Sequence, residues 1–123
     1  MGAYNTETVL GVLGFVLLVA ALVRAHSQSS SGPQLGEKEG ILYFIGGITG
    51  PVKVGITRRT ADQRLAELQT GAHQKLMVLG EFHVADAEDA EGKAHNLLAP
   101  YHIGGEWYKR SQALAFAESM RYS

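Results

Sequence analysis

The chain has 123 residues, of which 46% are hydrophobic and 19% are charged, and it contains no cysteine. This length accommodates one small domain with an appendage and leaves no room for a multidomain enzyme. Eleven Lys and Arg against 12 Asp and Glu give a net charge of -1, so nucleic-acid binding would need a local basic patch. The lack of cysteine excludes a disulfide scaffold, a cysteine-based zinc finger and a thiol nucleophile.

The most apolar segment lies close to the N-terminus. Residues 8–23 (TVLGVLGFVLLVAALV) contain no charged side chain. Sixteen helical residues extend roughly 24 Å, and the flanking residues lengthen the helix toward the roughly 30 Å of a bilayer core. We therefore expect residues 1–25 to form a single transmembrane helix that anchors the chain. The alternatives are a buried core helix and a cleaved signal peptide, although signal peptides begin with a basic region and only Glu7 carries charge before this run.

The residues after the apolar run predict its orientation. Arg24 and Lys38 follow the run and no basic residue precedes it, so the positive-inside rule places the C-terminal domain in the cytoplasm, at the inner (cytoplasmic) membrane. Residues 26–39 (HSQSSSGPQLGEKE) are rich in Ser and Gly, which is typical of a flexible linker. The predicted organisation is an anchor (1–25), a linker (26–39) and a globular domain (40–123).

Hydrophobic periodicity and turn residues predict the elements of the globular domain. A β-hairpin of residues 40–45 and 52–56 comes first. A helix then begins at Thr57 or Thr60 and ends near Gln69. A third strand (76–83), a helix (86–98), a short extended piece (106–108) and a last helix (111 to about 121) follow. This order predicts an α+β domain in which a small antiparallel sheet is flanked by helices.

Side chains alternate between the two faces of a strand, so the hairpin has an apolar and a polar face. The apolar residues at positions 42, 44, 52, 54 and 56 share the predicted core face. Tyr43, Lys53 and Gly55 share the opposite face, where Tyr43 and Lys53 are cross-strand neighbours if the turn places residue 43 opposite residue 53. Gly55 leaves a recess that a backbone or a phosphate could enter. The alternative is a solvated strand face with a Tyr–Lys pair.

The segment from residue 53 to residue 75 is locally basic. It holds five basic residues against two acidic ones, which is the kind of patch that nucleic-acid binding requires. Arg64 flanks the apolar stripe of the first helix and is expected to point along the seam beneath it. The alternative is an ordinary charged helix surface. The basic residues are Lys53, Arg58, Arg59, Arg64 and Lys75, and the acidic residues are Asp62 and Glu67.

One carboxylate of the 86–98 helix lies at the border of its apolar stripe. Glu91 lies beside the stripe, and His95 lies one turn further on the same side. A carboxylate in such a place is unfavourable unless it is paired or binds a metal, and one carboxylate with water molecules is a usual Mg²⁺ arrangement. Glu91 is therefore the candidate metal ligand. The alternative is a Glu91–His95 ion pair.

Five segments occur in a distinctive order: GILYFI, VKVGIT, RLAELQTG, AEGKAH and GGEWY. Together they resemble the GIY-YIG endonuclease superfamily, and within it a small phage and bacterial branch that has K-[IV]-G in the second motif and G-E-W-[FY] near the end. The resemblance extends from residue 40 to about residue 120 and leaves out the apolar N-terminal run. It implies a GIY-YIG-like fold and hydrolysis of DNA.

The resemblance also implies roles for single residues. Tyr43 matches the tyrosine proposed as the general base or water-orienting group, and Gly55 matches the glycine of the second motif. Arg64 matches the arginine that holds the scissile phosphate. Glu91 matches the glutamate that binds one Mg²⁺ or Mn²⁺.

The sequence departs from the superfamily at two places. Lys53 stands where the second tyrosine usually lies, and a cation beside a tyrosine favours the phenolate that could act as a base. The late asparagine has no counterpart, because Ile103 and Gly104 lie near its place. Glu106 or His95 could compensate for it.

We therefore expect a membrane-tethered, metal-dependent endonuclease that hydrolyses DNA. Our hypothesis for its role is action against incoming DNA, such as superinfection exclusion. The alternatives are a catalytically weak nucleic-acid-binding module and a membrane-bound protein-interaction domain. The expected catalytic residues are Tyr43, Lys53, Arg64 and Glu91, the expected DNA-binding residues are Arg58, Arg59, Lys75, His95 and Trp107, and the expected cofactor is Mg²⁺ or Mn²⁺ at Glu91.

Overall fold

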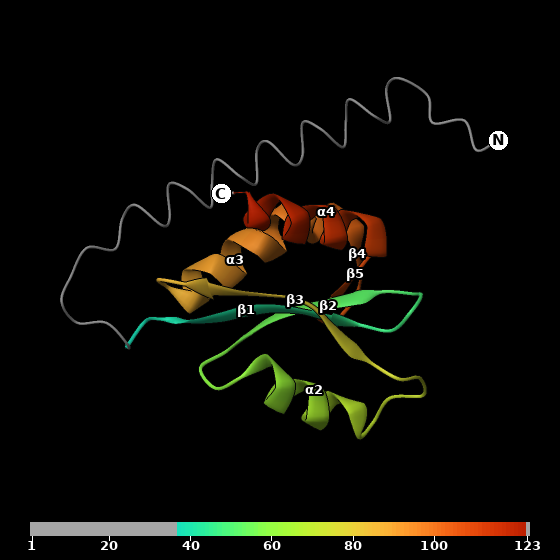
Figure 1. Cartoon of the computed structure of the whole chain (residues 1–123). Coiled ribbons are helices and arrows are strands. Elements are labelled where there is room, and N and C mark those ends of the chain that lie inside the picture. The colour runs from blue at the N-terminus through green and yellow to red at the C-terminus, as the bar shows by residue number, and fades with distance from the viewer. Residues whose placement is uncertain (1–36, 123) are drawn as a thin grey trace.

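The computed structural model describes residues 37–122 (Figure 1). The predicted anchor (1–25) and most of the predicted linker lie outside the described residues. Within residues 37–122, no helix is both long and apolar enough to cross a membrane. At the end of the predicted linker, the carbonyl oxygen of Lys38 accepts a 2.8 Å hydrogen bond from the backbone N–H of Ala87. This bond attaches the start of the domain to a later helix.

The described residues confirm a small α+β domain. Thr60, not Thr57, caps the first helix, because its side chain accepts from the backbone N–H of Gln63 while the Gln63 side chain accepts from the backbone N–H of Thr60. The sequence did not predict the short strand β4. In chain order the elements are β1 (Gly40–Gly46), β2 (Val52–Thr57), α2 (Ala61–Gln69), β3 (Met77–Val84), α3 (Ala87–Leu98), the 3-10 helix η1 (Ala99–Tyr101), β4 (His102–Gly104), β5 (Trp107–Tyr108) and α4 (Arg110–Arg121).

The five described strands form one antiparallel sheet in the order β3-β1-β2-β5-β4. Helices α3 and α4 cover one face of the sheet and α2 covers the other (Figure 1). The larger core lies on the α3 and α4 side, where Leu42, Phe44, Val52 and Val54 are fully buried. The predicted core face of the hairpin is therefore confirmed.

The opposite face of the hairpin is also buried. Tyr43 and Ile45 are 1% and 0% exposed and pack with Ala61 and Leu76. Leu65 of α2 packs against this smaller core. The predicted alternative of a solvated strand face is wrong, because the apolar stripe of α2 lies over it.

The register of the hairpin differs from the predicted one. Tyr43 pairs with Gly55, and Lys53 pairs with Ile45. Gly46 and Val52 are the last pair before the turn, so each residue of β1 lies opposite a residue two positions further along β2 than the sequence predicted. The predicted Tyr43–Lys53 cross-strand pair is therefore wrong.

Candidate functional site

The ring of Tyr43 lies across β2 at Gly55. A Cβ atom built at Gly55 would lie 2.5 Å from the Tyr43 Oη and 2.7 Å from its Cζ, so the absence of a side chain at Gly55 makes room for this tyrosine. The recess predicted at Gly55 exists, but Tyr43 itself fills it. Gly55 thus contributes to the site by positioning the Tyr43 hydroxyl.

Arg64 of α2 contacts this hydroxyl. Its guanidinium forms a side-chain hydrogen bond with Tyr43, and this bond is the main cause that raises the pKa of Arg64 above its ordinary value. The Arg64 side chain is 30% exposed, which agrees with the predicted position at the border of the α2 stripe. A cation therefore does lie beside Tyr43, but it comes from α2 and not from Lys53.

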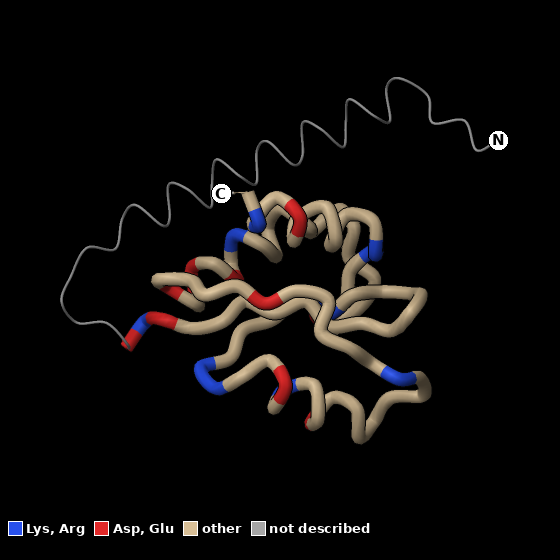
Figure 2. The backbone as a smooth tube through the Cα atoms, viewed as in Figure 1, with Lys and Arg blue, Asp and Glu red and all other residues tan. Residues whose placement is uncertain are grey.

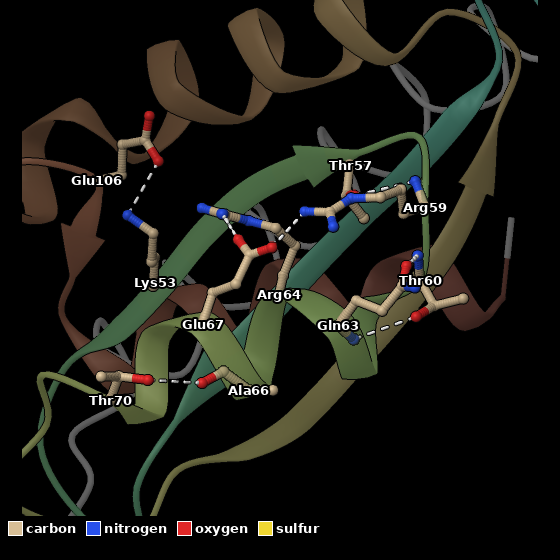
Figure 3. Close-up of polar contacts among 10 residues, drawn as sticks. All are labelled: Lys53, Thr57, Arg59, Thr60, Gln63, Arg64, Ala66, Glu67, Thr70 and Glu106. Carbon is tan, nitrogen blue, oxygen red and sulfur yellow. Dashed lines mark hydrogen bonds and ion pairs between the residues drawn. The ribbon is translucent and has the colours of Figure 1, made fainter.

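Glu67 joins two arginines on the same side of the domain. One carboxylate oxygen accepts from Arg64, and the other accepts from Arg59 in the loop before α2 (Figure 3). These two guanidiniums lower the pKa of Glu67, the hydrogen bond from Arg59 being the largest cause. We call Tyr43, Arg59, Arg64 and Glu67 the arginine cluster.

The remaining basic residues do not form one continuous patch. Arg58 is exposed beside Arg59 in the loop before α2, and Lys75 is exposed in the loop before β3. Figure 2 shows the basic residues of these two loops at opposite ends of α2. The predicted local excess of positive charge is thus split, and Glu67 neutralises part of it.

The outer edge of β2 is completed by side chains of α3. Strand β5 pairs with β2 only at Val52 and Lys53. Beyond that point, the backbone N–H of Val54 donates to the Glu106 carbonyl oxygen at 3.0 Å. The carbonyl oxygen of Val54 lies 2.9 Å from Nε2 of His95, a bond in which the imidazole N–H donates.

Glu91 completes the same side of β2 two residues further on, at Ile56. The backbone N–H of Ile56 donates to its carboxylate. We call Glu91, His95 and Glu106 the β2-edge cluster. Two of its members use their side chains to satisfy backbone groups of β2 beyond the point where β5 stops pairing with it, which is a structural role that sequence spacing did not reveal.

The Glu91 carboxylate is half-buried, and the groups around it shift its pKa in opposite directions. Burial raises its pKa above the ordinary value; His95 acts in the opposite direction and Glu106 adds to the rise. The predicted proximity of Glu91 and His95 is thus present, but their interaction does not outweigh the loss of hydration. A divalent cation binding here would replace that hydration, and Mg²⁺ accepts one or two carboxylates with water molecules. The residues therefore fit the predicted ion, although no group of three His, Cys, Asp or Glu suited to a metal occurs within residues 37–122.

Lys53 has partners other than the predicted one. Its Nζ lies 3.1 Å from Oε2 of Glu106 (Figure 3) and 5.8 Å from the centre of the Trp107 ring. Its side chain is only 14% exposed. Trp107 is half-buried and packs against the smaller core, with the Lys53 ammonium over its ring.

Tyr108 is a member of this region that the sequence did not identify as a residue of the nuclease site. It is 4% exposed, and its ring centre lies 5.6 Å from that of His95. Burial, followed by the charges of Glu106 and Glu91, raises the pKa of Tyr108. The only sequence signal was its place at the end of the GGEWY segment.

Comparison with known proteins agrees with part of these expectations. A family model, the T5orf172 domain, matches residues 40–120, the same residues that carry the five segments described above. This is a phage-associated domain reported to resemble a GIY-YIG or HNH-like nuclease fold. No curated protein and no solved structure matches the chain.

Proposed function

This chain belongs to the T5orf172 domain family, and we propose that it is a metal-dependent endonuclease of the GIY-YIG type that hydrolyses DNA. One observation carries the proposal: the guanidinium of Arg64 is held against the hydroxyl of Tyr43. A phosphate-binding cation and a group able to orient water therefore lie together. Hydrolysis of a phosphodiester needs both, since the transition state gains negative charge while a water molecule attacks.

Arg64 is suited to hold the scissile phosphate. A guanidinium offers parallel N–H donors that match two phosphate oxygens. Arg59 lies within reach of the same carboxylate as Arg64, so the two arginines can share one anion. Arg58 is exposed in the same loop and would contact a neighbouring phosphate of the backbone.

Tyr43 is suited to orient the attacking water. As the phenolate it would accept the proton of that water. The water oxygen then bonds to phosphorus, the bond to the leaving oxygen breaks, and that oxygen takes a proton from solvent. Glu91 would hold the metal, and Mg²⁺ or Mn²⁺ bound there supplies Lewis-acid stabilisation of the phosphate charge.

Lys53 supports the site from its edge. Its positive charge pairs with Glu106 and so offsets the repulsion between the carboxylates of Glu91 and Glu106. We therefore propose that Lys53 positions Glu106 and that His95 fixes the α3 side of the edge through Val54.

We also propose that residues 8–23 attach the enzyme to the inner membrane, with the domain in the cytoplasm and DNA entering the cell as its substrate. The support is the uncharged run and the position of Arg24 after it. Fractionation of cells that express the full chain tests this proposal. Recovery of the intact protein without detergent would contradict it.

Nicking of a supercoiled plasmid by the full chain tests the nuclease proposal. We expect nicking with Mg²⁺ or Mn²⁺ and none with EDTA. A matched control is Arg121→Ala, because Arg121 pairs with Glu118 in the same i, i+3 relation as Arg64 with Glu67, but on α4. Nicking that is lost in Arg64→Ala and kept in Arg121→Ala supports the assigned site.

A second candidate function is DNA binding without cleavage. It is favoured by the nearly complete burial of Tyr43 and by the apolar Ile103, 56% exposed, near the place of the superfamily's late asparagine. Salt-dependent DNA binding with no metal-dependent nicking would establish this function instead.

A further inference from the structure

Glu67 has an unusual arrangement for a surface carboxylate. Its two oxygens each accept from a different guanidinium, Arg59 before α2 and Arg64 on α2 (Figure 3). The same Arg64 also contacts Tyr43. The carboxylate thus lies within the proposed catalytic constellation rather than on an unrelated surface.

Local hydrogen bonds hold the backbone at both arginines of this pair. The capping box of Thr60 and Gln63 fixes the start of α2, so Arg64 and Glu67 stand one turn apart on the same side of the helix. The backbone N–H of Arg59 donates to Thr57 Oγ1 at 3.1 Å, which holds the loop that carries the second arginine.

Two guanidiniums on two oxygens of one anion form the arrangement that a phosphodiester adopts with its two non-bridging oxygens. The Glu67 side chain is 42% exposed and that of Arg59 is 56% exposed, so an incoming anion can reach the pair without unfolding. Exposed ion pairs of this kind contribute little stability and can be exchanged for a stronger anion.

We propose that Glu67 occupies the position of the substrate phosphate and must leave it when DNA binds. This inference rests on the proposed function, because it assumes that Arg59 and Arg64 receive a phosphate. It assigns Glu67 the role of an internal competitor that sets the affinity for phosphate.

Glu118 on α4 provides a matched control. It pairs with Arg121 in the same i, i+3 relation, and the two side chains are 50% and 53% exposed. Glu67→Gln and Glu118→Gln therefore remove the same charge from similar exposed pairs, one inside the proposed site and one outside it.

The test uses full-length protein with two probes, inorganic phosphate and a 20-base-pair duplex. Phosphate binding is followed by NMR of the arginine side-chain N–H groups, and duplex affinity is measured over a range of salt concentrations. We expect Glu67→Gln to bind both probes about 3- to 10-fold more tightly at low salt, because a competing like charge is removed. Glu118→Gln should bind them like the wild type.

Equal or weaker binding by Glu67→Gln, or an equal gain in Glu118→Gln, would overturn the inference. If Glu67 only positions Arg64, Glu67→Gln should lose cleavage without gaining affinity, and Glu67→Asp should restore part of the cleavage. A gain in phosphate affinity without any cleavage by the wild type would uphold this inference while rejecting the nuclease. Cleavage by the wild type without that gain would do the reverse.

Discussion

The arginine cluster and the β2-edge cluster are built on opposite principles. In the arginine cluster, Glu67 is exposed and its pKa is lowered by the two arginines it joins. In the β2-edge cluster, Glu91 is half-buried, its pKa is raised by burial, and it accepts from the backbone of β2. In the first cluster the charges satisfy one another, whereas the second completes β2 beyond the point where β5 stops pairing with it.

The two clusters therefore differ in how far a substitution can change function without also changing stability. An exposed ion pair can be removed with little effect on folding, so changes in Arg59 and Glu67 should alter binding and catalysis alone. A carboxylate that satisfies a backbone N–H cannot be removed so simply. Changes in Glu91 should therefore act on both, unless the replacement keeps an acceptor oxygen.

The largest expected effect is that of Glu91→Gln on cleavage. The amide keeps the shape and one acceptor oxygen but loses the charge that would hold a divalent ion. Cleavage should fall roughly 1,000-fold, which corresponds to the several kcal/mol that a Lewis-acid metal supplies. Plasmid nicking at saturating Mg²⁺ measures it, and DNA affinity should stay the same or rise because repulsion from phosphate is relieved.

Glu91→Ala sharpens the same comparison. It should also abolish metal-dependent cleavage, but in addition it leaves the Ile56 N–H without its partner, at a cost of about 1–3 kcal/mol. Urea denaturation of the two variants should therefore differ while their nicking does not. Cleavage at the wild-type rate in Glu91→Gln would show that the metal, if required, binds elsewhere.

Arg64→Ala should have the next largest effect. It removes the proposed donor to the phosphate and the partner of the Tyr43 hydroxyl, and the loss of one such donor should reduce catalysis about 100-fold. Stability should fall by about 1–3 kcal/mol, because the buried Tyr43 hydroxyl is left without its partner. Arg58→Ala, in contrast, should weaken DNA binding and reduce the salt dependence of affinity, as the loss of one phosphate contact does. Wild-type cleavage by both variants would contradict the assigned phosphate site.

Gly55→Ala tests how the fold holds Tyr43. The added methyl group would lie within 2.5–2.7 Å of the Tyr43 phenol, so the buried ring must move. We expect a loss of about 1–3 kcal/mol of stability from this overpacking, together with reduced cleavage. Thermal or urea denaturation measures the first effect. The double variant Gly55→Ala with Tyr43→Phe keeps most of the clash, since Cζ remains, and separates crowding from the loss of the hydroxyl.

The sequence predicted the fold class and the core because these follow from local pattern. Alternation in the hairpin identified Leu42 and Phe44 as core residues, and the capping residue Thr60 was one of the two candidates named for α2. Strand β4 was missed because three residues, two of them exposed, carry no alternating pattern that could identify a strand.

The candidate site was predicted less completely, because its contacts cross the sheet. The strand register of Tyr43 depends on the length of the hairpin turn. Its partner Arg64 comes from α2, which covers the face of the hairpin for which the sequence allowed either a functional site or a solvated surface. Glu67 was identified only as an acidic residue of the patch, since an i, i+3 spacing to Arg64 does not reveal the contact with Arg59. The structural use of Glu91 and His95 at β2 depends on where β5 ends, which no local pattern encodes.

The smallest expected effect is on the pH dependence of stability, where the two clusters should differ in sign. Burial raises the pKa of Glu91 above 4.5 in the folded protein, so the folded state binds this proton more tightly than the unfolded state. Stability from Glu91 is therefore greatest below pH 4.5 and falls as the pH rises from there through the raised value. The pKa of Glu67 is lowered below 4.5, so its contribution is complete above pH 4.5 and is lost as the pH falls through the lowered value.

Urea denaturation from pH 3 to pH 7 in the presence of EDTA, with the wild type, Glu91→Gln and Glu67→Gln, separates the two contributions. Other carboxyl groups titrate alike in all three proteins, so only the differences between curves matter. The stability of Glu91→Gln relative to the wild type should increase as the pH rises above 4.5, because burial disfavours the charged carboxylate of the wild type. The stability of Glu67→Gln relative to the wild type should decrease as the pH rises from 3 toward 4.5. Difference curves of the same sign would show that the two carboxylates lie in similar environments. The distinction between the arginine cluster and the β2-edge cluster would then fail.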